Sequence, residues 1–447
     1  MKNDFYIILF LIFSFLLQSG CSLQQEKDLK QNWACTNCNV IIIDISVLKA
    51  DHLGAYGYER NTSSYIDTFA EKSLLFRNMI SASSWTLPSV MSIFTSTYPT
   101  EHGLVNNKIK YPNGELKRAN IKEINPNIVT LAEILNKSGY VTAGFTGDAH
   151  LNSSYGYGNG FSFYYDDTPF SGFEKTIPFA LRWLESNKDK KFFLFIQGYD
   201  LHGRYILSQN TSRKFINSTY AGKYSGAIEE QIYLRDLNLQ RGYLNLSDED
   251  REFWISLYDS KLYDADERIG RFLMQLENLD LLNRSIVIIL GDHGEELFEH
   301  KGIDHGYSLY DELIHVPLII HIPNSNKQIR IYEQVRTVDL FPTIIEILDL
   351  KISENLEDQI RGESLIPIMN GQKSDLDAYS ETDYLYKVFK RSIRKSNGWK
   401  IIYSIDTNEF ELYNLNKDPS EKNNLVEQEP KIAYGMEQEL LKYMYER

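Results

Sequence analysis

Three short runs of apolar residues, many of them β-branched, constrain the fold of this chain most strongly. They are Asn39 to Ile45 (NVIIIDI), Phe192 to Gln197 (FFLFIQ) and Ser285 to Leu290 (SIVIIL). Apolar runs of this length without polar alternation are typical of strands buried on both faces of a parallel sheet. Such a sheet requires helices on both of its faces.

Helical patterns do lie between these runs. They cover Ile66 to Leu75, Ser89 to Phe94, Ile128 to Ser138 and Leu257 to Leu279. Alternating strands and helices predict an α/β fold with a doubly wound, mostly parallel sheet flanked by helices. The polar stretch from Leu207 to Asp250 is interpreted as an insertion over the site. Ligands of such folds bind beyond the carboxyl ends of the strands.

The pattern changes near residue 350. Tyr379 to Tyr403 and Glu409 to Leu415 predict short antiparallel strands, and Pro430 to Tyr445 predicts a final helix. We therefore expect a catalytic domain over 22–350 and a smaller α+β subdomain over 351–447.

The N-terminus has the features of an export signal. Lys2 precedes an apolar run from Phe5 to Leu17, which is shorter than the roughly 20 residues of a spanning helix. Gly20-Cys21 resembles the end of a bacterial lipobox. We expect 1–21 to be a signal peptide and the protein to be a cell-envelope lipoprotein anchored at Cys21. A plain cleaved signal or an uncleaved anchor is the alternative.

Charge and cysteine content limit the partners further. The net charge of −14 over 447 residues argues against nucleic acid, whereas an anionic small substrate remains compatible if a metal reverses the local field. Cys35 and Cys38 cannot supply the four ligands of a structural zinc, so they predict a local disulfide or two free thiols.

Polar groups follow the predicted strands. Asp292-His293 comes directly after the late run, and Gly294 permits a turn there. An acid beside a histidine at a strand end can bind a divalent metal, although a hydrogen-bonded turn would have the same sequence. His300 and His305 follow closely, which favours the metal.

Thr86, in the segment SWTLPS, is a second candidate. Pro88 fits the first turn of a helix, so Thr86 is expected just before a helix N-terminus, where anions bind. A hydroxyl beside a metal can be a nucleophile. The alternative is that Thr86 simply caps the helix.

Taken together, these segments resemble the sulfatase family within the alkaline phosphatase superfamily. The resemblance runs in order from about Asn39 to Leu425. It is carried by NVIIIDISVLKADHLGAYGY, SSWTLPSVMSIFTSTYPTEHG, QGYDLHGRY, LGDHGEELFEHKGIDHGYSLYDELIHVPLII, VDLFPTIIEIL and ELYNLNKDPSEKNNL. It implies an alkaline-phosphatase-like fold, a metal cofactor and an ester substrate.

The nucleophile position departs from the family pattern. Sulfatases convert a cysteine or serine to formylglycine, but Thr86 stands here, with Val90 at the position of the closing arginine. Oxidation of threonine cannot give the aldehyde. Relatives with an unmodified threonine bind a metal with it, which implies that Thr86, Asp292 and His293 are ligands. The imidazole favours zinc or manganese over calcium, which remains possible.

The first strand departs as well. The family places acidic residues where Ser46 and Val47 stand, and the only nearby acid is Asp44, two residues earlier. A local bulge would bring Asp44 to the metal as a fourth ligand. Otherwise Asp44 is a structural acid and the site has lost a carboxylate.

The resemblance also implies roles for three further residues. His202 is the candidate general acid, Asp200 of the same loop is a candidate substrate-binding residue, and His305 matches a position where relatives place a cation.

We therefore expect a metal-dependent hydrolase of sulfate or phosphate esters that acts through Thr86, with phosphate esters preferred. Its substrate would be a small anionic ester, or a sulfated or phosphorylated glycan or lipid. The alternatives are a phospho-headgroup transferase of the same superfamily and a catalytically degenerate binding protein.

Overall fold

A computed structural model gives the structure of the protein. It describes residues 32–105, 108–110, 116–118, 125–203, 205, 214–323, 325, 327–385 and 387–445. The expected signal peptide over 1–21 and its Cys21 lie outside the described residues, so export and lipidation stay predictions.

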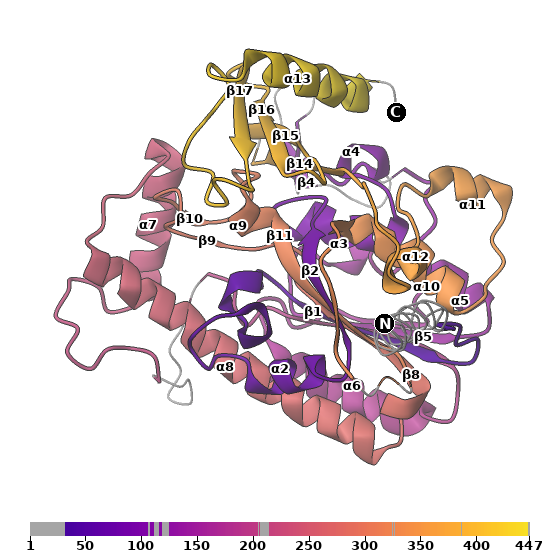
Figure 1. Cartoon of the computed structure of the whole chain (residues 1–447). Helices are drawn as coiled ribbons and strands as arrows, with labels where there is room; N and C mark the ends of the chain where they lie inside the picture. The colour runs from indigo at the N-terminus through magenta and orange to yellow at the C-terminus, as the bar shows by residue number, and fades with distance from the viewer. Residues whose placement is uncertain are drawn as a thin grey trace, which may run out of the picture.

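A nine-stranded sheet forms the centre of the molecule (Figure 1). Its order is β12-β2-β11-β8-β1-β7-β5-β6, and β13 pairs with β2. All neighbours are parallel except β11, which runs antiparallel to β2 and β8. The strands are β1 (Asn39–Ile45), β2 (Leu74–Ile80), β5 (Val141–Phe145), β6 (Phe163–Tyr165), β7 (Phe192–Gly198), β8 (Ser285–Leu290), β11 (His315–His321), β12 (Ile329–Ile331) and β13 (Val335–Arg336).

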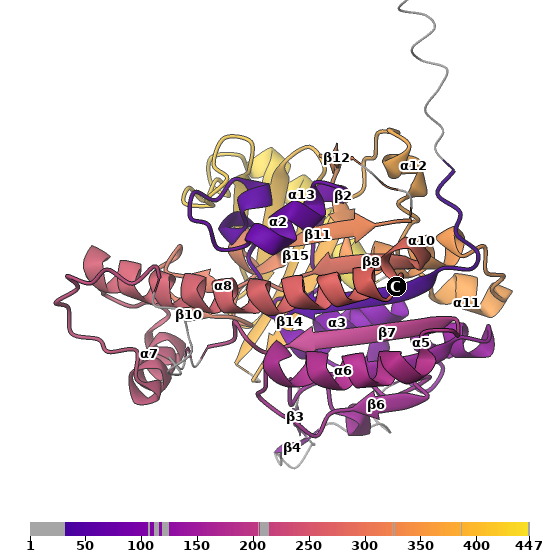
Figure 2. The ribbon, with the colours of Figure 1, turned by 90° about the horizontal axis from the view of Figure 1, so that it is seen from below.

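Helices cover both faces, and strand alternation decides which residues face each layer. Val40 and Ile42 of β1 belong to one core cluster, and Ile41 and Ile43 belong to the other. The first cluster includes α3 (Thr86–Thr95), α5 (Leu131–Lys137), α10 (Leu340–Ile347), α11 (Glu354–Gln359) and α12 (Ile366–Met369). The second includes α2 (Ser64–Ala70), α6 (Phe173–Asn187), α7 (Ile228–Arg241) and α8 (Asp248–Asn278). Figure 2 shows α6 and α8 running across the second face.

The predicted fold class is confirmed, with one corrected element. The structure is a doubly wound α/β sheet, and β1 and β8 have the predicted bounds. The helix predicted over Ile66 to Leu75 is wrong at its end, because α2 stops at Ala70 and β2 begins at Leu74. Leu74 and Leu75 continue the helical spacing, but they are buried in the sheet.

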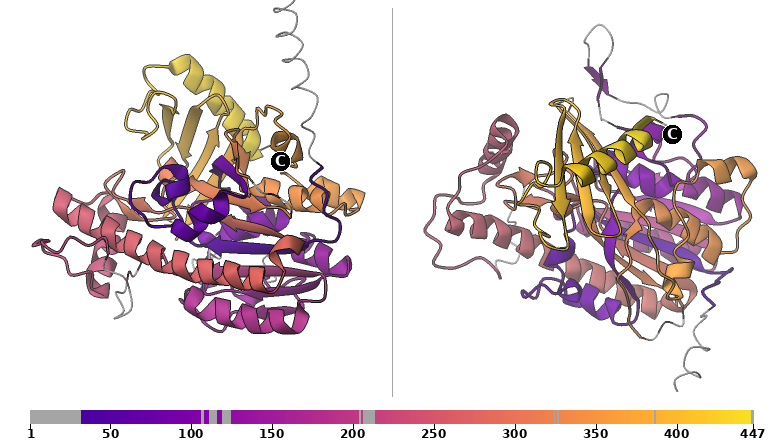
Figure 3. Two further views of the ribbon diagram at one scale, coloured as in Figure 1. Left: turned by 60° about the horizontal axis from the view of Figure 1, so that its bottom comes forward. Right: turned by 45° about the horizontal axis from the view of Figure 1, so that its top comes forward.

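The predicted C-terminal subdomain is also confirmed. A four-stranded antiparallel sheet contains β14 (Ala378–Tyr384), β15 (Val388–Arg394), β16 (Trp399–Ser404) and β17 (Glu409–Asn414), and α13 (Pro430–Tyr445) packs on it. Met436 and Leu440 of α13 are buried against this sheet. Figure 3 shows the subdomain, in yellow, as a layer beside the main sheet.

The remaining elements are short. They are α4 (Pro99–His102), β3 (Lys108–Lys110), β4 (Leu116–Arg118), β9 (Glu296–Leu297), β10 (Ile303–Asp304), α9 (Asp311–Ile314) and 3-10 helices at 50–52, 54–56, 153–155, 282–284 and 337–339. Cys35 and Cys38 form a disulfide, which is one of the two states that the sequence left open. Among the described residues, none of the helices combines the length and apolar character needed to cross a membrane.

Candidate active site

Thr86 is the first residue of α3 and is buried. The preceding Trp85 occupies the N-cap position, so the interpretation of Thr86 as a simple cap is wrong. Its Oγ1 lies 3.1 Å from Nε2 of His293 and 3.4 Å from Oγ of Ser46. The hydroxyl therefore faces the strand ends rather than its own helix.

His293 is held in one tautomer. Its Nδ1 lies 2.8 Å from the carbonyl oxygen of Gly294 and donates to it. Nε2 therefore carries the lone pair that faces the hydroxyl of Thr86. Burial lowers the pKa of His293 well below its usual value, so the ring is neutral at pH 7. A neutral imidazole in this orientation can bind a metal or accept a proton.

Asp292 is fixed by main-chain donors. Its Oδ1 accepts hydrogen bonds from the N–H groups of His293 at 2.9 Å and Val47 at 3.3 Å, while Oδ2 has no partner. Burial and the charge of Asp148 raise its pKa to about 7, against these amide contacts. Gly294 is required next to this pair because a methyl group would overlap the carbonyl oxygen of Glu312.

Asp44 lies in β1 without a bulge. It pairs in regular register with Gln197 and Leu290, and it shares the face of Ile42, which packs toward α3. It is only 1% exposed, and no hydrogen bond of normal geometry reaches either carboxylate oxygen. Burial and the charges of Asp292 and Asp148 raise its pKa well above the usual value. An unpartnered carboxylate in this position calls for a cation.

The residues that replace the family's acids have other contacts. Ser46 places its hydroxyl beside Thr86, as described above. Val47 has a φ of 59°, which is unusual and strained for a β-branched residue. Its carbonyl accepts a hydrogen bond from Tyr258 at 2.9 Å, and its N–H binds Asp292. The strained turn therefore holds one of the candidate ligands.

Asp148, which the sequence reasoning missed, is a third buried carboxylate, and its charge raises the pKa of Asp44 and of Asp292. It lies three residues after β5, so the strand-end rule that found Asp44 would also have found it. The signal was weak, because a lone acid in a loop has no distinctive spacing.

His202 and His305 lie together. Their rings contact edge to face at 4.6 Å, and the ring of His305 lies 4.6 Å from that of His293. His202 stacks on Tyr199 at 4.0 Å. Burial and the neighbouring His305 lower the pKa of His202 well below its usual value. The structure thus brings both predicted histidines to the Asp292-His293 turn.

A carboxylate pair surrounds His305. Its Nδ1 lies 3.0 Å from Asp304 and 3.3 Å from Glu295, and these two carboxylates raise its pKa although burial opposes them. One donor atom from each of the three lies within 4.8 Å of the others, which is compact enough for a metal. However, Arg235 forms an ion pair with Asp304. Arg235 and His305 therefore offset part of the negative charge of Asp304 and Glu295, while Oε2 of Glu295 has no hydrogen-bond partner.

Asp200 has other partners. Its Oδ2 accepts the N–H of Phe173 at 2.7 Å at the start of α6, and its Oδ1 pairs with Arg268 of α8 at 2.9 Å. Both oxygens are thus occupied within the protein. Neither contact involves Thr86, Asp292 or His293.

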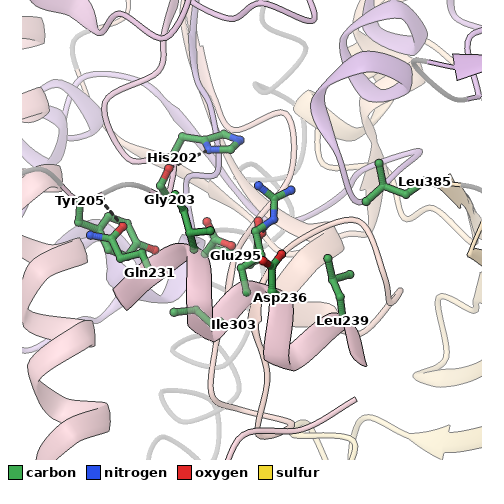
Figure 4. Close-up of a pocket in the computed structure, with 12 residues that line it drawn as sticks. His202, Gly203, Tyr205, Gln231, Asp236, Leu239, Glu295, Ile303 and Leu385 are labelled. Atoms are coloured by element: carbon green, nitrogen blue, oxygen red, sulfur yellow. Dashed lines mark hydrogen bonds and ion pairs between the residues drawn. The ribbon is translucent and has the colours of Figure 1, made fainter. Parts of the chain in front are cut away.

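A pocket of about 290 Å³ opens beside the histidines (Figure 4). Residues of α7, including Gln231, Asp236 and Leu239, face His202 and Glu295 across it. The predicted insertion therefore supplies one wall of a pocket next to the site. The other residues that line it are Gly203, Tyr205, Ile232, Arg235, Ile303, Asp304 and Leu385.

By donor type, four buried residues suit a divalent metal ion, although the acids and histidines of the described residues whose ligand atoms gather within 4.8 Å of one another are Glu295, Asp304 and His305. Asp44, Asp292, His293 and Thr86 offer carboxylate, imidazole and hydroxyl donors, and the two carboxylates have unpartnered oxygens at full burial. Two like charges in a buried site are costly without a cation.

The chain belongs to the sulfatase family. The sulfatase family model matches residues 38–350, and a model described as N-sulphoglucosamine sulphohydrolase, C-terminal, matches residues 299–446. The first match covers the sheet and every candidate site residue. It confirms the family that the sequence segments resembled, while the role of Thr86 stays a prediction.

The chain is also similar to known sulfatases and to a solved hydrolase structure. An ulvan-active sulfatase of Formosa agariphila is 24% identical over 393 residues, which are 82% of this chain and 71% of the relative. Arylsulfatase K of Mus musculus is 26% identical over 196 residues, and the chain spans only about a third (34%) of its length. The solved phosphonate monoester hydrolase of Agrobacterium radiobacter has a TM-score of 0.69 at 18% identity, covering 91% of this chain and 95% of that one.

Proposed function

We propose that this protein is a metal-dependent hydrolase of anionic esters in which unmodified Thr86 is the nucleophile. The observation that supports it most is the 3.1 Å contact between the Thr86 hydroxyl and Nε2 of His293. The hydroxyl thus faces a fixed lone pair, and the unpartnered Oδ2 of Asp292 lies 3.5 Å from the same nitrogen.

Asp44, Thr86, Asp292 and His293 would hold one divalent ion, with zinc or manganese favoured by the imidazole. When bound, such an ion lowers the pKa of a coordinated hydroxyl and neutralises charge on the transferred group. His293 keeps its lone pair available because Gly294 accepts its other ring proton.

The reaction proceeds in two displacements. Oγ1 of Thr86 loses its proton to solvent and attacks phosphorus or sulfur, and the bond from that atom to the ester oxygen breaks. The leaving oxygen takes a proton, for which His202 is the candidate donor. Water then attacks the same atom and loses a proton, the bond to Oγ1 breaks, and Oγ1 takes up a proton, so that Thr86 is restored.

Phosphate esters fit this nucleophile better than sulfate esters. A formylglycine hydrate can expel sulfate by using its second hydroxyl, which a threonine ester does not have. The Thr86 ester must therefore be opened by attack at phosphorus or sulfur. The phosphonate monoester hydrolase neighbour shows that this fold also serves phosphorus chemistry.

The substrate class is a small anionic ester, or a sulfated or phosphorylated glycan or lipid. A relative described as ulvan-active supports the glycan within this class. The pocket beside His202 has room for one sugar ring or a group of similar size. We further propose that the protein is exported to the bacterial cell envelope and anchored at Cys21.

The test compares Thr86→Val with wild type on matched phosphate and sulfate esters. Valine keeps the shape of threonine and removes the hydroxyl, so activity should fall by roughly 10³-fold or more. Thr95→Val is the matched control, because Thr95 is a buried threonine of the same helix whose hydroxyl binds Met91 and Thr97. Activity of Thr86→Val equal to wild type would exclude the nucleophile assignment.

A degenerate binding protein is the second candidate, and Ser46 favours it because a carboxylate of the family pattern is absent there. In that case wild type hydrolyses no ester of the panel and binds no metal. A wild-type protein that holds metal and turns over an ester contradicts this candidate.

A further inference from the structure

We propose that Glu295, Asp304 and His305 form a second divalent-metal site, separate from the ion proposed at Thr86. The ligand would be zinc or a similar transition-metal ion, because one donor is an imidazole and two are carboxylates. The inference goes beyond the proposed function, and it does not depend on Thr86 being the nucleophile.

A short hairpin brings the three residues together. β9 begins directly after Glu295, and β10 ends at Asp304, immediately before His305. The two strands are antiparallel, and Asp304 lies opposite Glu296, the neighbour of Glu295. The three side chains are therefore placed by backbone pairing rather than by an unpaired loop, and all three residues are buried.

The spacing of the donor atoms already resembles that of a metal site. Nδ1 of His305 lies 3.0 Å from Oδ1 of Asp304 and 3.3 Å from Oε1 of Glu295. One ligand atom from each residue lies within 4.8 Å of the others. At zinc–ligand bonds of about 2.0–2.2 Å, the donors of a tetrahedral site lie roughly 3.3–3.6 Å apart. An ion therefore fits between the three side chains after small movements.

The protein's own hydrogen bonds leave this cluster incomplete. Nδ1 of His305 carries at most one proton, although it faces two carboxylates. Oε2 of Glu295 accepts no hydrogen bond from the described part of the chain, and Glu295 is fully buried. A buried carboxylate oxygen without a partner is costly, so it points to a ligand beyond the protein's own groups.

Asp304 is held in the way that metal-binding carboxylates usually are. Its Oδ2 pairs with Arg235 of α7, while its Oδ1 accepts the main-chain N–H of His305 at 3.0 Å. Ligating carboxylates are commonly oriented by such outer partners. Arg235 can therefore stay in place when an ion binds Oδ1. Because its positive charge lowers the affinity, we expect this ion to be weaker than the one proposed at Thr86 and to be lost during purification.

The pocket beside the cluster gives access to it. Glu295 and Asp304 both line the pocket, and Figure 4 shows Glu295 among the side chains that surround it. Three protein ligands leave one position of a tetrahedral zinc ion open, which is typical of catalytic sites. A water molecule or an oxygen of a bound ester would complete the coordination.

The test counts zinc sites by titrating ZnCl₂ into the purified chain after treatment with a chelator. We expect wild type to bind about two equivalents, the second more weakly, and Glu295→Gln to bind about one. Glutamine keeps the size of the side chain and removes its charge. Loss of a direct ligand should weaken the second site by more than the roughly 10-fold to 100-fold that loss of an outer partner costs.

Melting temperatures in chelator separate a lost ligand from a damaged fold. Glu295→Gln should melt at the wild-type temperature or above it, because a buried carboxylate oxygen without a partner has been removed. Asp304→Asn is the second variant if Glu295→Gln does not fold. It keeps an oxygen toward His305, and asparagine tolerates the φ of 86° at this position. It should also lose the weaker site.

Two further variants calibrate the count. Glu312→Gln is the matched control, because Glu312 also pairs with a histidine, His300, at 2.5 Å but is not one of the three clustered residues. It should bind zinc as wild type does. Asp292→Ala removes a ligand of the ion proposed at Thr86 and should keep the weaker site.

The outcomes distinguish this site from the proposed function. Zinc binding in Glu295→Gln equal to that of wild type excludes the inference and leaves the proposed function intact. The same holds if Asp292→Ala binds no zinc at all. Loss of the weaker site together with a lower melting temperature in chelator assigns Glu295 a structural role instead. If Asp292→Ala binds zinc as wild type does and Glu295→Gln binds none, the inference stands and the metal site proposed at Thr86 fails.

Discussion

At the residue scale, the arrangement of Thr86 and His293 determines what chemistry is available. The side chain of Thr86 does not cap its helix, because Trp85 holds the cap position and the Thr86 hydroxyl turns to Nε2 of His293. The carbonyl oxygen of Gly294 accepts a hydrogen bond from the other ring nitrogen of His293, Nδ1. The Thr86 hydroxyl and the Nε2 lone pair can therefore face one cation together, which a hydroxyl that caps its own helix cannot do.

His202 can be tested as the proton donor by changing the leaving group. Its ring stacks on Tyr199 and lines the pocket, so His202→Gln should leave the fold intact. A general acid matters most for poor leaving groups, so sugar or alkyl esters should lose roughly 10²-fold in kcat/KM and nitrophenyl esters less than about 10-fold. Equal losses on both ester types would contradict the role. This comparison also addresses the lowered pKa of the ring, which leaves little of the protonated form that a general acid needs.

The sequence predicted some site residues for sound reasons and missed others. Asp44 was found as the only acid near the strand end, and the alternation of β1 places it on the α3 face without the bulge considered beforehand. Asp200 occupies the predicted loop, but its carboxylate is bound to Phe173 and Arg268. The orientation of the Asp200 side chain depends on packing against α6 and α8, which the spacing of residues in the sequence does not reveal. Asp148 had no spacing signal at all.

At the element scale, three strands and the start of one helix build the site. Asp44 is the last residue but one of β1, Asp148 lies three residues after β5, Asp292 lies two residues after β8, and α3 begins at Thr86. Buried strands were predictable, because uninterrupted apolar runs fit only the centre of a sheet. The position of β11 between β2 and β8 was not, because antiparallel insertion depends on long-range pairing.

The turn after β8 should tolerate no side chain at Gly294. Gly294→Ala would push the turn away from the Glu312 carbonyl, with a cost of about 1–3 kcal/mol and a loss of metal binding. Gly435→Ala is the control, because Gly435 is exposed on α13 and has open space around it. That control should raise helix stability by up to about 1 kcal/mol. Thermal melts and metal titrations of both variants measure these effects. A Gly294→Ala protein with the melting temperature and metal affinity of wild type would contradict the predicted overlap with Glu312.

At the scale of the whole molecule, one large sheet domain carries the site and an antiparallel subdomain lies beside it. α7 of the large domain, within the stretch interpreted as an insertion, forms a wall of the pocket. The family match covers the same domain. Differences among relatives in substrate would therefore be expected at α7 rather than in the strands.

The proposed membrane attachment through Cys21 can be tested with the full-length chain. Cys21→Ser should move the protein from the membrane fraction to the soluble fraction of bacterial cells, because the residue would no longer accept a lipid. An immunoblot of fractionated cells measures this, with Cys35→Ser as a control that leaves Cys21 in place. Unchanged fractionation of Cys21→Ser would point to an uncleaved apolar anchor at Phe5 to Leu17 instead.

The most direct measurement is the metal content of the purified wild-type chain. The proposed site requires a cation among buried carboxylates that have unpartnered oxygens. We expect about one equivalent of zinc or manganese per chain, and almost none in Asp292→Ala or His293→Ala proteins that remain folded. A folded, correctly processed wild-type protein that retains no stoichiometric metal after growth and dialysis with both ions would exclude the proposed metal site.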